Sequence, residues 1–110
     1  MSEALVVLTN VGDGAVAQLI ARRLVEQKLA ACVNILPGVS SIYRWQGKVE
    51  EAEEVTLMIK TVRSSYAGLE ASIKAMHPYE VPEIIALPIV AGLPAYLDWV
   101  MQEIKKDSDD

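Results

Sequence analysis

Residues 33–60, "VNILPGVSSIYRWQGKVEEAEEVTLMIK", have the pattern of a long β-hairpin. The pair Gln46-Gly47 near the middle is typical of a two-residue hairpin turn. Before it, residues 33–45 have strand character, with an expected bulge or bend at Pro37-Gly38, because proline lacks an N–H and glycine lacks a Cβ. After it, residues 55–60 alternate in the manner of a returning strand. The stretch therefore predicts two long antiparallel strands.

Strand and helix patterns flank this hairpin on both sides. Asp13 is placed to cap a helix whose apolar residues recur three and four positions apart. Pro88 predicts that the last strand lies at a sheet edge or ends there, and Pro94 suits the first position of a helix. The expected elements outside the hairpin are a strand over 4–8, a helix over 15–28, a helix over 64–76, a strand over 84–90 and a helix from 94 to about 104.

This order predicts an α+β fold of the ferredoxin-like, split βαβ type, βαββαβ plus a C-terminal helix. Two helices should cover one face of the sheet. We assign the alternating residues Val55, Leu57 and Ile59 to the other face, which then needs cover from the C-terminal helix or from another molecule. We expect a single domain over residues 1–104 and a disordered acidic tail over 105–110.

Composition excludes several classes of function. With 15 acids and 10 bases among 110 residues, the net charge of −5 repels nucleic-acid backbones. The apolar runs are far shorter than the ~20 residues that span a bilayer, so no membrane partner is expected. The first residues lack the basic segment of a signal peptide, which predicts a cytoplasmic location. The single cysteine, Cys32, is read as a small buried hydrophobic residue.

The length of the hairpin predicts self-association. About thirteen extended residues at roughly 3.3 Å each reach about 43 Å, whereas a chain of this size has a radius of gyration near 13 Å. The tip, with Tyr43 and Trp45 close to it, should overhang the protomer and expose aromatic surface. We therefore expect a homo-oligomer.

Two other motifs are interpreted as structural. Residues 12–17 match G-x-G-x-x-A, but no acid follows about 20 residues later to bind a ribose, so we interpret the glycines as a turn before a helix. Four acids of the hairpin are interpreted as a solvated arm rather than a cation site: Glu50, Glu51, Glu53 and Glu54.

Three segments resemble the CutA family of divalent-cation tolerance proteins. They are residues 29–61, "HPYEVPEIIALPI" at 77–89 and "GLPAYLDWV" at 92–100, and together they span nearly the whole chain. The resemblance implies a ferredoxin-like protomer in a tight homotrimer in the cytoplasm. It also implies a role in tolerance of copper and other divalent cations, with no established reaction. The family is similar in architecture to PII-type signalling trimers, whose clefts between subunits bind nucleotides.

The resemblance also indicates candidate metal ligands. In a bacterial member of the family, copper binding is ascribed to a cysteine at the end of the first strand and to two adjacent histidines before the Pro-Tyr pair. Those positions are Thr9, Met76 and His77 in this sequence. A threonine hydroxyl replaces a thiolate poorly, but a methionine thioether suits Cu(I). The alternative for Met76 is core packing at a helix end.

His77, the only histidine, has two interpretations that remain open. It is a metal ligand, with oxygen donors from Glu80 and Glu83, or it caps the preceding helix through a ring N–H. A third interpretation concerns Glu83, which needs a partner if it is partly buried, and Lys60 is the candidate.

Such a pair would mark a ligand cleft between subunits, with aromatic walls. The alternative is that these aromatic side chains pack in the trimer interface. The cleft candidates are Tyr43, Trp45, Lys60, Tyr79, Glu83 and Trp99.

The sequence thus favours a cytoplasmic homotrimer that responds to divalent metal ions and binds copper or a similar cation. It has no catalytic triad, metal-hydrolase motif or phosphate loop, so we expect no enzyme. The alternative is a PII-like signalling or scaffold trimer whose clefts bind a small organic ligand or a partner. A further alternative is that trimer stability is itself the selected property.

Overall fold

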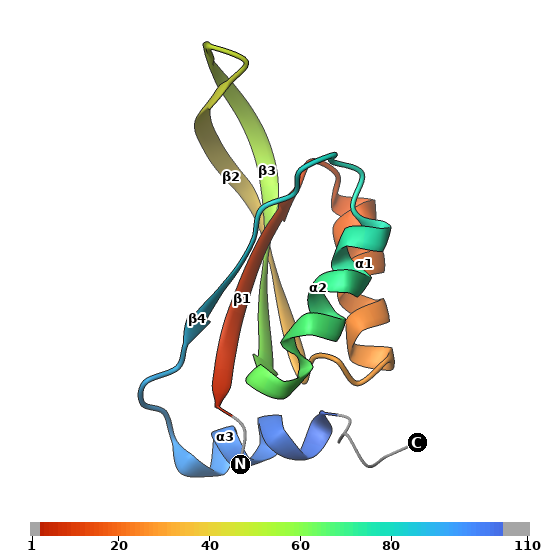
Figure 1. The fold of residues 1–110 in the computed structure, drawn as a ribbon, viewed down its shortest axis with the longest axis vertical. Coiled ribbons are helices and arrows are strands. Elements are labelled where there is room, and N and C mark those ends of the chain that lie inside the picture. Colours follow the sequence, from red (N-terminus) through yellow and green to blue (C-terminus); the bar gives the residue numbers. More distant parts are fainter. Residues whose placement is uncertain (1–2, 105–110) are drawn as a thin grey trace.

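A computed structural model describes residues 3–104, and the tail expected over 105–110 lies outside this range. Four antiparallel strands form one sheet in the order β2-β3-β1-β4, with helices α1 and α2 on one face (Figure 1). The elements are β1 (Ala4–Val11), α1 (Gly14–Glu26), β2 (Cys32–Trp45), β3 (Lys48–Val62), the short 3-10 helix η1 (Arg63–Ser65), α2 (Tyr66–Met76), β4 (Ile84–Pro88) and α3 (Pro94–Glu103).

The topology confirms the predicted ferredoxin-like fold. In the unit β1-α1-β2, strand β3 lies between the two strands, and in β3-α2-β4, strand β1 lies between them. Each βαβ unit is therefore split by a strand of the other. The expected C-terminal helix follows as α3.

The hairpin β2-β3 forms as the sequence predicts. Gln46 and Gly47 have φ angles of 50° and 82°, the left-handed values that a tight hairpin turn requires. The register shifts between Leu36 and Val39, where Gly38 has a φ of 73°, so the expected bulge is present. The tip extends beyond the remainder of a molecule that measures 45 × 29 × 22 Å (Figure 1).

Helix α1 begins and ends through identifiable local contacts. Asp13 is its N-cap, and its Oδ1 accepts a hydrogen bond of 2.7 Å from the backbone N–H of Ala15. The helix ends at Glu26, two residues before the predicted end, because Lys28 has a φ of 60° and the chain leaves the helical path there.

The main core lies between the sheet and the two helices. Leu57 and Ile59 are fully buried in it, so our assignment of their face to the open side of the sheet is wrong. The alternation of β3 was read correctly, but a period of two does not say which face is covered. The open face instead has Thr56, Met58 and Lys60, all half-buried.

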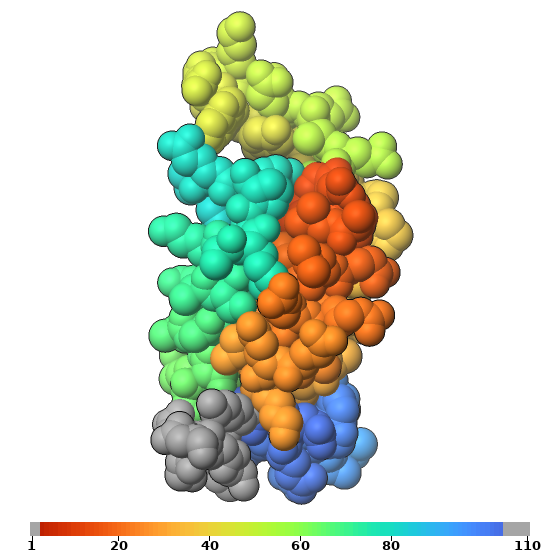
Figure 2. Space-filling view, turned by 90° about the vertical axis from the view of Figure 1, so that its right-hand side faces the viewer, coloured from red at the N-terminus to blue at the C-terminus, as the bar shows by residue number. Residues whose placement is uncertain are grey.

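Helix α3 packs across one end of the sheet rather than over its open face (Figure 1). Val100 and Ile104 pack against Ala31, which directly precedes β2, and Val62, which ends β3, both at the end of the sheet away from the hairpin tip. In Figure 2, α1 and α2 lie side by side with α3 below them and the hairpin projecting above.

Strand β4 lies at the edge of the sheet, and within residues 3–104 it pairs only with β1. Pro88 is its last residue, because proline has no N–H to donate to a neighbouring strand. The strand therefore ends two residues earlier than predicted. Pro94 occupies the first turn of α3, as predicted.

The N-cap of α1 yields a first prediction. Asp13→Ala removes the acceptor for the Ala15 N–H and should lower the free energy of unfolding by about 1 kcal/mol. Asp13→Asn keeps a side-chain oxygen and should stay within a few tenths of wild type. Denaturant unfolding of both variants measures the difference, and equal losses would contradict a role for the cap.

Two fully buried threonines offer a matched pair. Thr61 Oγ1 donates to the carbonyl of Leu29 at 2.7 Å, whereas Thr9 Oγ1 is buried without a hydrogen-bond partner among residues 3–104. Thr9→Val should raise the free energy of unfolding by about 1 kcal/mol, and Thr61→Val should lower it by about 1–3 kcal/mol. Loss of stability in both variants would show that the Thr9 hydroxyl has a partner.

Candidate functional site

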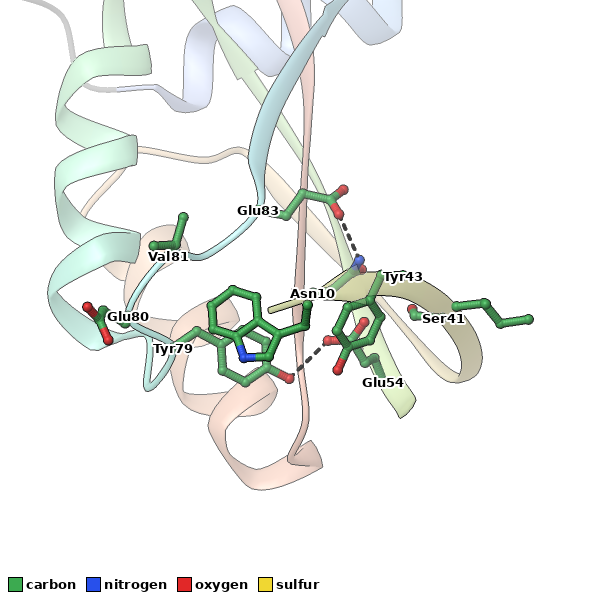
Figure 3. Close-up of a pocket in the computed structure, with 10 residues that line it drawn as sticks. Asn10, Ser41, Tyr43, Glu54, Tyr79, Glu80, Val81 and Glu83 are labelled. Atoms are coloured by element: carbon green, nitrogen blue, oxygen red, sulfur yellow. Dashed lines mark hydrogen bonds between the residues drawn. The ribbon is translucent and has the colours of Figure 1, made fainter. Parts of the chain in front are cut away.

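A groove of about 620 Å³ lies between the hairpin and the loop that joins α2 to β4. Figure 3 shows Asn10 of β1, Tyr43 and Glu54 of the hairpin and Tyr79 of the loop close together, whereas Glu80 and Val81 lie on the outer side of the loop. The lining residues are Asn10, Ser41, Ile42, Tyr43, Trp45, Glu54, Tyr79, Glu80, Val81 and Glu83.

Asn10, near the end of β1, fixes the inner side of the groove. Its Oδ1 accepts a 2.6 Å hydrogen bond from the hydroxyl of Thr56, which lies opposite it on β3. Its Nδ2 donates to Glu83 Oε1 at 3.3 Å (Figure 3). Asn10 therefore holds the loop carboxylate close to the sheet.

Tyr79 crosses from the loop to the hairpin. Its hydroxyl donates to Glu54 Oε2 at 2.9 Å (Figure 3). Burial, the hydrogen bond to Glu54 and the negative charge of that carboxylate raise the pKa of Tyr79 to about 12, so the phenol stays protonated and remains a donor. A Cβ at Gly12 would lie 3.0 Å from this hydroxyl, which gives that glycine a packing role.

His77 anchors the same loop and is 7% exposed. Its Nδ1 accepts from the backbone N–H of Tyr79 at 3.1 Å, which places the ring proton on Nε2. Nε2 then donates to the carbonyl of Asn10 at 2.7 Å. The ring thus joins the loop to β1. It does not cap α2, although one interpretation of the sequence proposed this. Of the His77 donors, the backbone N–H bonds the helix, at the carbonyl of Ile73.

The three predicted metal ligands do not form a ready-made site in the protomer. Both ring nitrogens of His77 have protein partners, Met76 packs against the core, and Thr9 is fully buried. Within the described range 3–104, no three His, Cys, Asp or Glu side chains gather closely enough to bind a metal ion. Their assignment as ligands stays a prediction.

Four of the six predicted cleft residues meet at the groove, namely Tyr43, Trp45, Tyr79 and Glu83. The other two lie elsewhere in the protomer. Lys60 donates to Asn34 Oδ1, and Trp99 on α3 packs against Tyr96 with ring centroids 5.7 Å apart.

The expected Lys60–Glu83 pair does not form, because the strand register separates the two residues. Lys60 lies opposite Val6 of β1, whereas Glu83 bonds Asn10, four residues further along that strand. At about 3.4 Å per residue, this offset is about 14 Å.

Sequence reasoning missed Asn10 and Glu54. Glu54 was grouped with the solvated acids of the hairpin, and Glu50, Glu51 and Glu53 are indeed exposed. Glu54 itself is half-buried, and its carboxylate bonds the hydroxyl of Tyr79. No sequence pattern shows that Tyr79 reaches Glu54.

No helix among residues 3–104 is long and apolar enough to cross a membrane.

Comparison with known proteins identifies relatives along almost the whole chain. A family model described as CutA1 divalent ion tolerance protein matches residues 5–103. The divalent-cation tolerance protein CutA of Thermus thermophilus is 54% identical over 97 residues, which cover 88% of this chain and 94% of that protein. A CutA homolog of Xenopus laevis is 58% identical over 85 residues. The aligned region covers 77% of this chain and 56% of that relative.

Solved structures agree. The crystal structure of CutA1 from Oryza sativa superposes with a TM-score of 0.93 at 40% sequence identity, covering 96% of this chain and 97% of that one. The family match, the sequence identity and the shared fold together show that this chain belongs to the CutA1 family of divalent ion tolerance proteins.

Proposed function

We propose that this chain acts in the tolerance of divalent metal ions, as a cytoplasmic homotrimer that catalyses no reaction. The observation that carries this proposal is the family match over residues 5–103. The proposed contacts to copper or a similar cation are His77, Met76 and Thr9, the positions at which the family's ligands are expected.

The shape and surface of the protomer support self-association. The hairpin exposes large apolar side chains, with Ile42 at 71%, Val49 at 68% and Trp45 at 51% of their surface. The face of the sheet opposite α1 and α2 is only half-buried at Met58, and edge strand β4 exposes Ile85 and Leu87. Association of copies would remove this apolar surface from water.

The metal proposal has a geometric requirement. Copper binds the lone pair of a neutral imidazole, but Nδ1 of His77 already accepts from the Tyr79 N–H and Nε2 carries a proton. The protomer's donors therefore do not fit copper as they stand. Binding at His77 has to release one of these hydrogen bonds and has to recruit donors beyond those the protomer gathers.

The groove favours a second function, that of a PII-like trimer that binds a small organic ligand. It brings four predicted cleft residues together in a concave, partly aromatic site of the size that small ligands occupy. This observation is independent of any metal.

The trimer proposal is tested by sedimentation equilibrium. Three copies of the 12.0 kDa protomer give an expected mass of about 36 kDa, independent of concentration in the micromolar range. A stable species of one protomer's mass under these conditions would sink the proposal.

The metal proposal is tested by calorimetric titration of Cu(II) into wild type and His77→Ala. If His77 is a ligand, the variant should bind at least tenfold more weakly, because one donor of few is lost. Thr9→Cys serves as the matched gain-of-ligand variant and should bind more tightly, since a thiolate is a better copper ligand than a hydroxyl. Equal heats and stoichiometry in wild type and His77→Ala would remove His77 from the site.

A circular dichroism melt of His77→Ala without metal accompanies the titration. The imidazole bonds both Asn10 and Tyr79, so the variant loses stability for reasons unrelated to copper. Titration well below its melting midpoint separates the two effects.

A further inference from the structure

The groove combines aromatic rings with negative charge. Three of its residues are aromatic, and three others are carboxylates: Tyr43, Trp45 and Tyr79, with Glu54, Glu80 and Glu83. Among the described residues that line it, none is Lys, Arg or His. The charge of the groove is thus of one sign and is not neutralised from within.

The carboxylates retain acceptor capacity for a ligand. Glu54 uses Oε2 to accept from Tyr79, and Glu83 uses Oε1 to accept from Asn10, so each has a second oxygen without a protein donor in the described structure. The side chain of Glu80 forms no hydrogen bond within residues 3–104 and is exposed. The carboxylates of the groove therefore have more oxygen acceptors than the protein's own donors occupy.

The same bonds occupy two of the donors that an anion would need. The hydroxyl of Tyr79 is directed to Glu54, and the amide of Asn10 is directed to Glu83. A carboxylate or phosphate ligand would meet three like charges, and the side-chain donors left to it are the hydroxyls of Ser41 and Tyr43 and the indole N–H of Trp45. The charge of the groove therefore disfavours an anionic ligand.

A bare metal ion fits the groove poorly. Metal ligands must converge on one point at about 2.0–2.6 Å, whereas no three acidic, His or Cys side chains of residues 3–104 gather in this way. The carboxylates are instead distributed around a space of about 620 Å³ with aromatic walls. Such a space suits a larger cation with an apolar body, which aromatic faces attract through cation–π interaction.

We propose that the groove binds a small organic cation, an ammonium ion that carries alkyl groups. The carboxylates supply the charge attraction, and the rings of Tyr43, Trp45 and Tyr79 contact the alkyl groups. This inference rests on the second proposed function, a ligand-binding role for the groove, and names the ligand class.

The test uses tryptophan fluorescence of the full chain, as it assembles in solution. The chain has two tryptophans, and Trp99→Phe leaves Trp45 in the groove as the reporter. The probes are Nα-acetyl-trimethyllysine amide, the neutral Nα-acetyl-norleucine amide and the acidic Nα-acetyl-aminoadipate amide, titrated in buffer with a chelator. The trimethyllysine probe should saturate with an affinity at least tenfold above that of the other two, and this affinity should fall with added salt.

Matched variants locate the binding. Glu80→Gln removes a groove charge without removing a side-chain hydrogen bond and should weaken binding of the cationic probe about fivefold. Glu51→Gln makes the same charge change on an exposed residue of β3 outside the groove and should leave the affinity within twofold. Equal effects of the two variants would overturn the assignment to this groove.

The outcomes distinguish the proposed binding of an organic cation from the more general proposal that the groove binds a small ligand. Equal binding of the cationic and norleucine probes, or preferential binding of the acidic probe, overturns the cation proposal and keeps a ligand-binding groove. No binding of any probe counts against both. The chelator makes every result independent of the proposed metal site.

Discussion

The candidate site depends on Asn10, which connects three segments of the chain at one point. Its carbonyl accepts from the ring of His77, its Oδ1 from Thr56, and its Nδ2 donates to Glu83. Each of these contacts joins β1 to a segment distant in sequence, because β1 lies in the interior of the sheet between β3 and β4. Replacement of the Asn10 side chain would remove the bonds to Glu83 and Thr56, whereas the bond to His77 would remain because the backbone carbonyl accepts it.

The hairpin forms the side of the groove opposite the loop that joins α2 to β4. Because β2 and β3 continue past the ends of β1 and β4, their outer parts form a wall opposite the loop (Figure 1). Tyr79 bridges the gap through Glu54, and the space that remains is the groove. The overhang that exposes apolar surface for association therefore also produces the concave site.

The parts of the structure that depend on local chemistry could be predicted from the sequence. The turn at Gln46-Gly47, the bulge at Pro37-Gly38 and the cap at Asp13 follow from backbone preferences of those residues. Tyr79 and Glu83 were predicted to line a cleft between subunits; they line one groove of the protomer, and the cleft between subunits stays a prediction.

The parts that depend on register and on sheet faces could not be predicted. Alternation in β3 shows that Leu57 and Lys60 point to opposite sides, but only the position of the helices decides that Leu57 is buried. The predicted Lys60–Glu83 pair does not form because strand pairing places Lys60 opposite Val6, four residues along β1 from Asn10, which Glu83 bonds. No feature of either residue in the sequence reveals this separation. Glu54 and Asn10 escaped notice for the same reason, since their roles exist only once β1, β3 and the loop are together.

His77 has a structural use that explains its position without reference to a metal. A neutral imidazole is one of few side chains that donate at one end and accept at the other, and here it joins an N–H of the loop to a carbonyl of β1. Two nearby residues agree with this structural role, since Met76 packs against the core and the ring of Tyr79 contacts the imidazole at a centroid distance of 4.7 Å with the planes tilted by 56°. Any ligand of Nδ1 must displace the Tyr79 N–H, and Tyr79 carries the bond to Glu54. Occupancy at His77 would therefore act first on the wall of the groove, so the two candidate functions of this chain meet at one side chain.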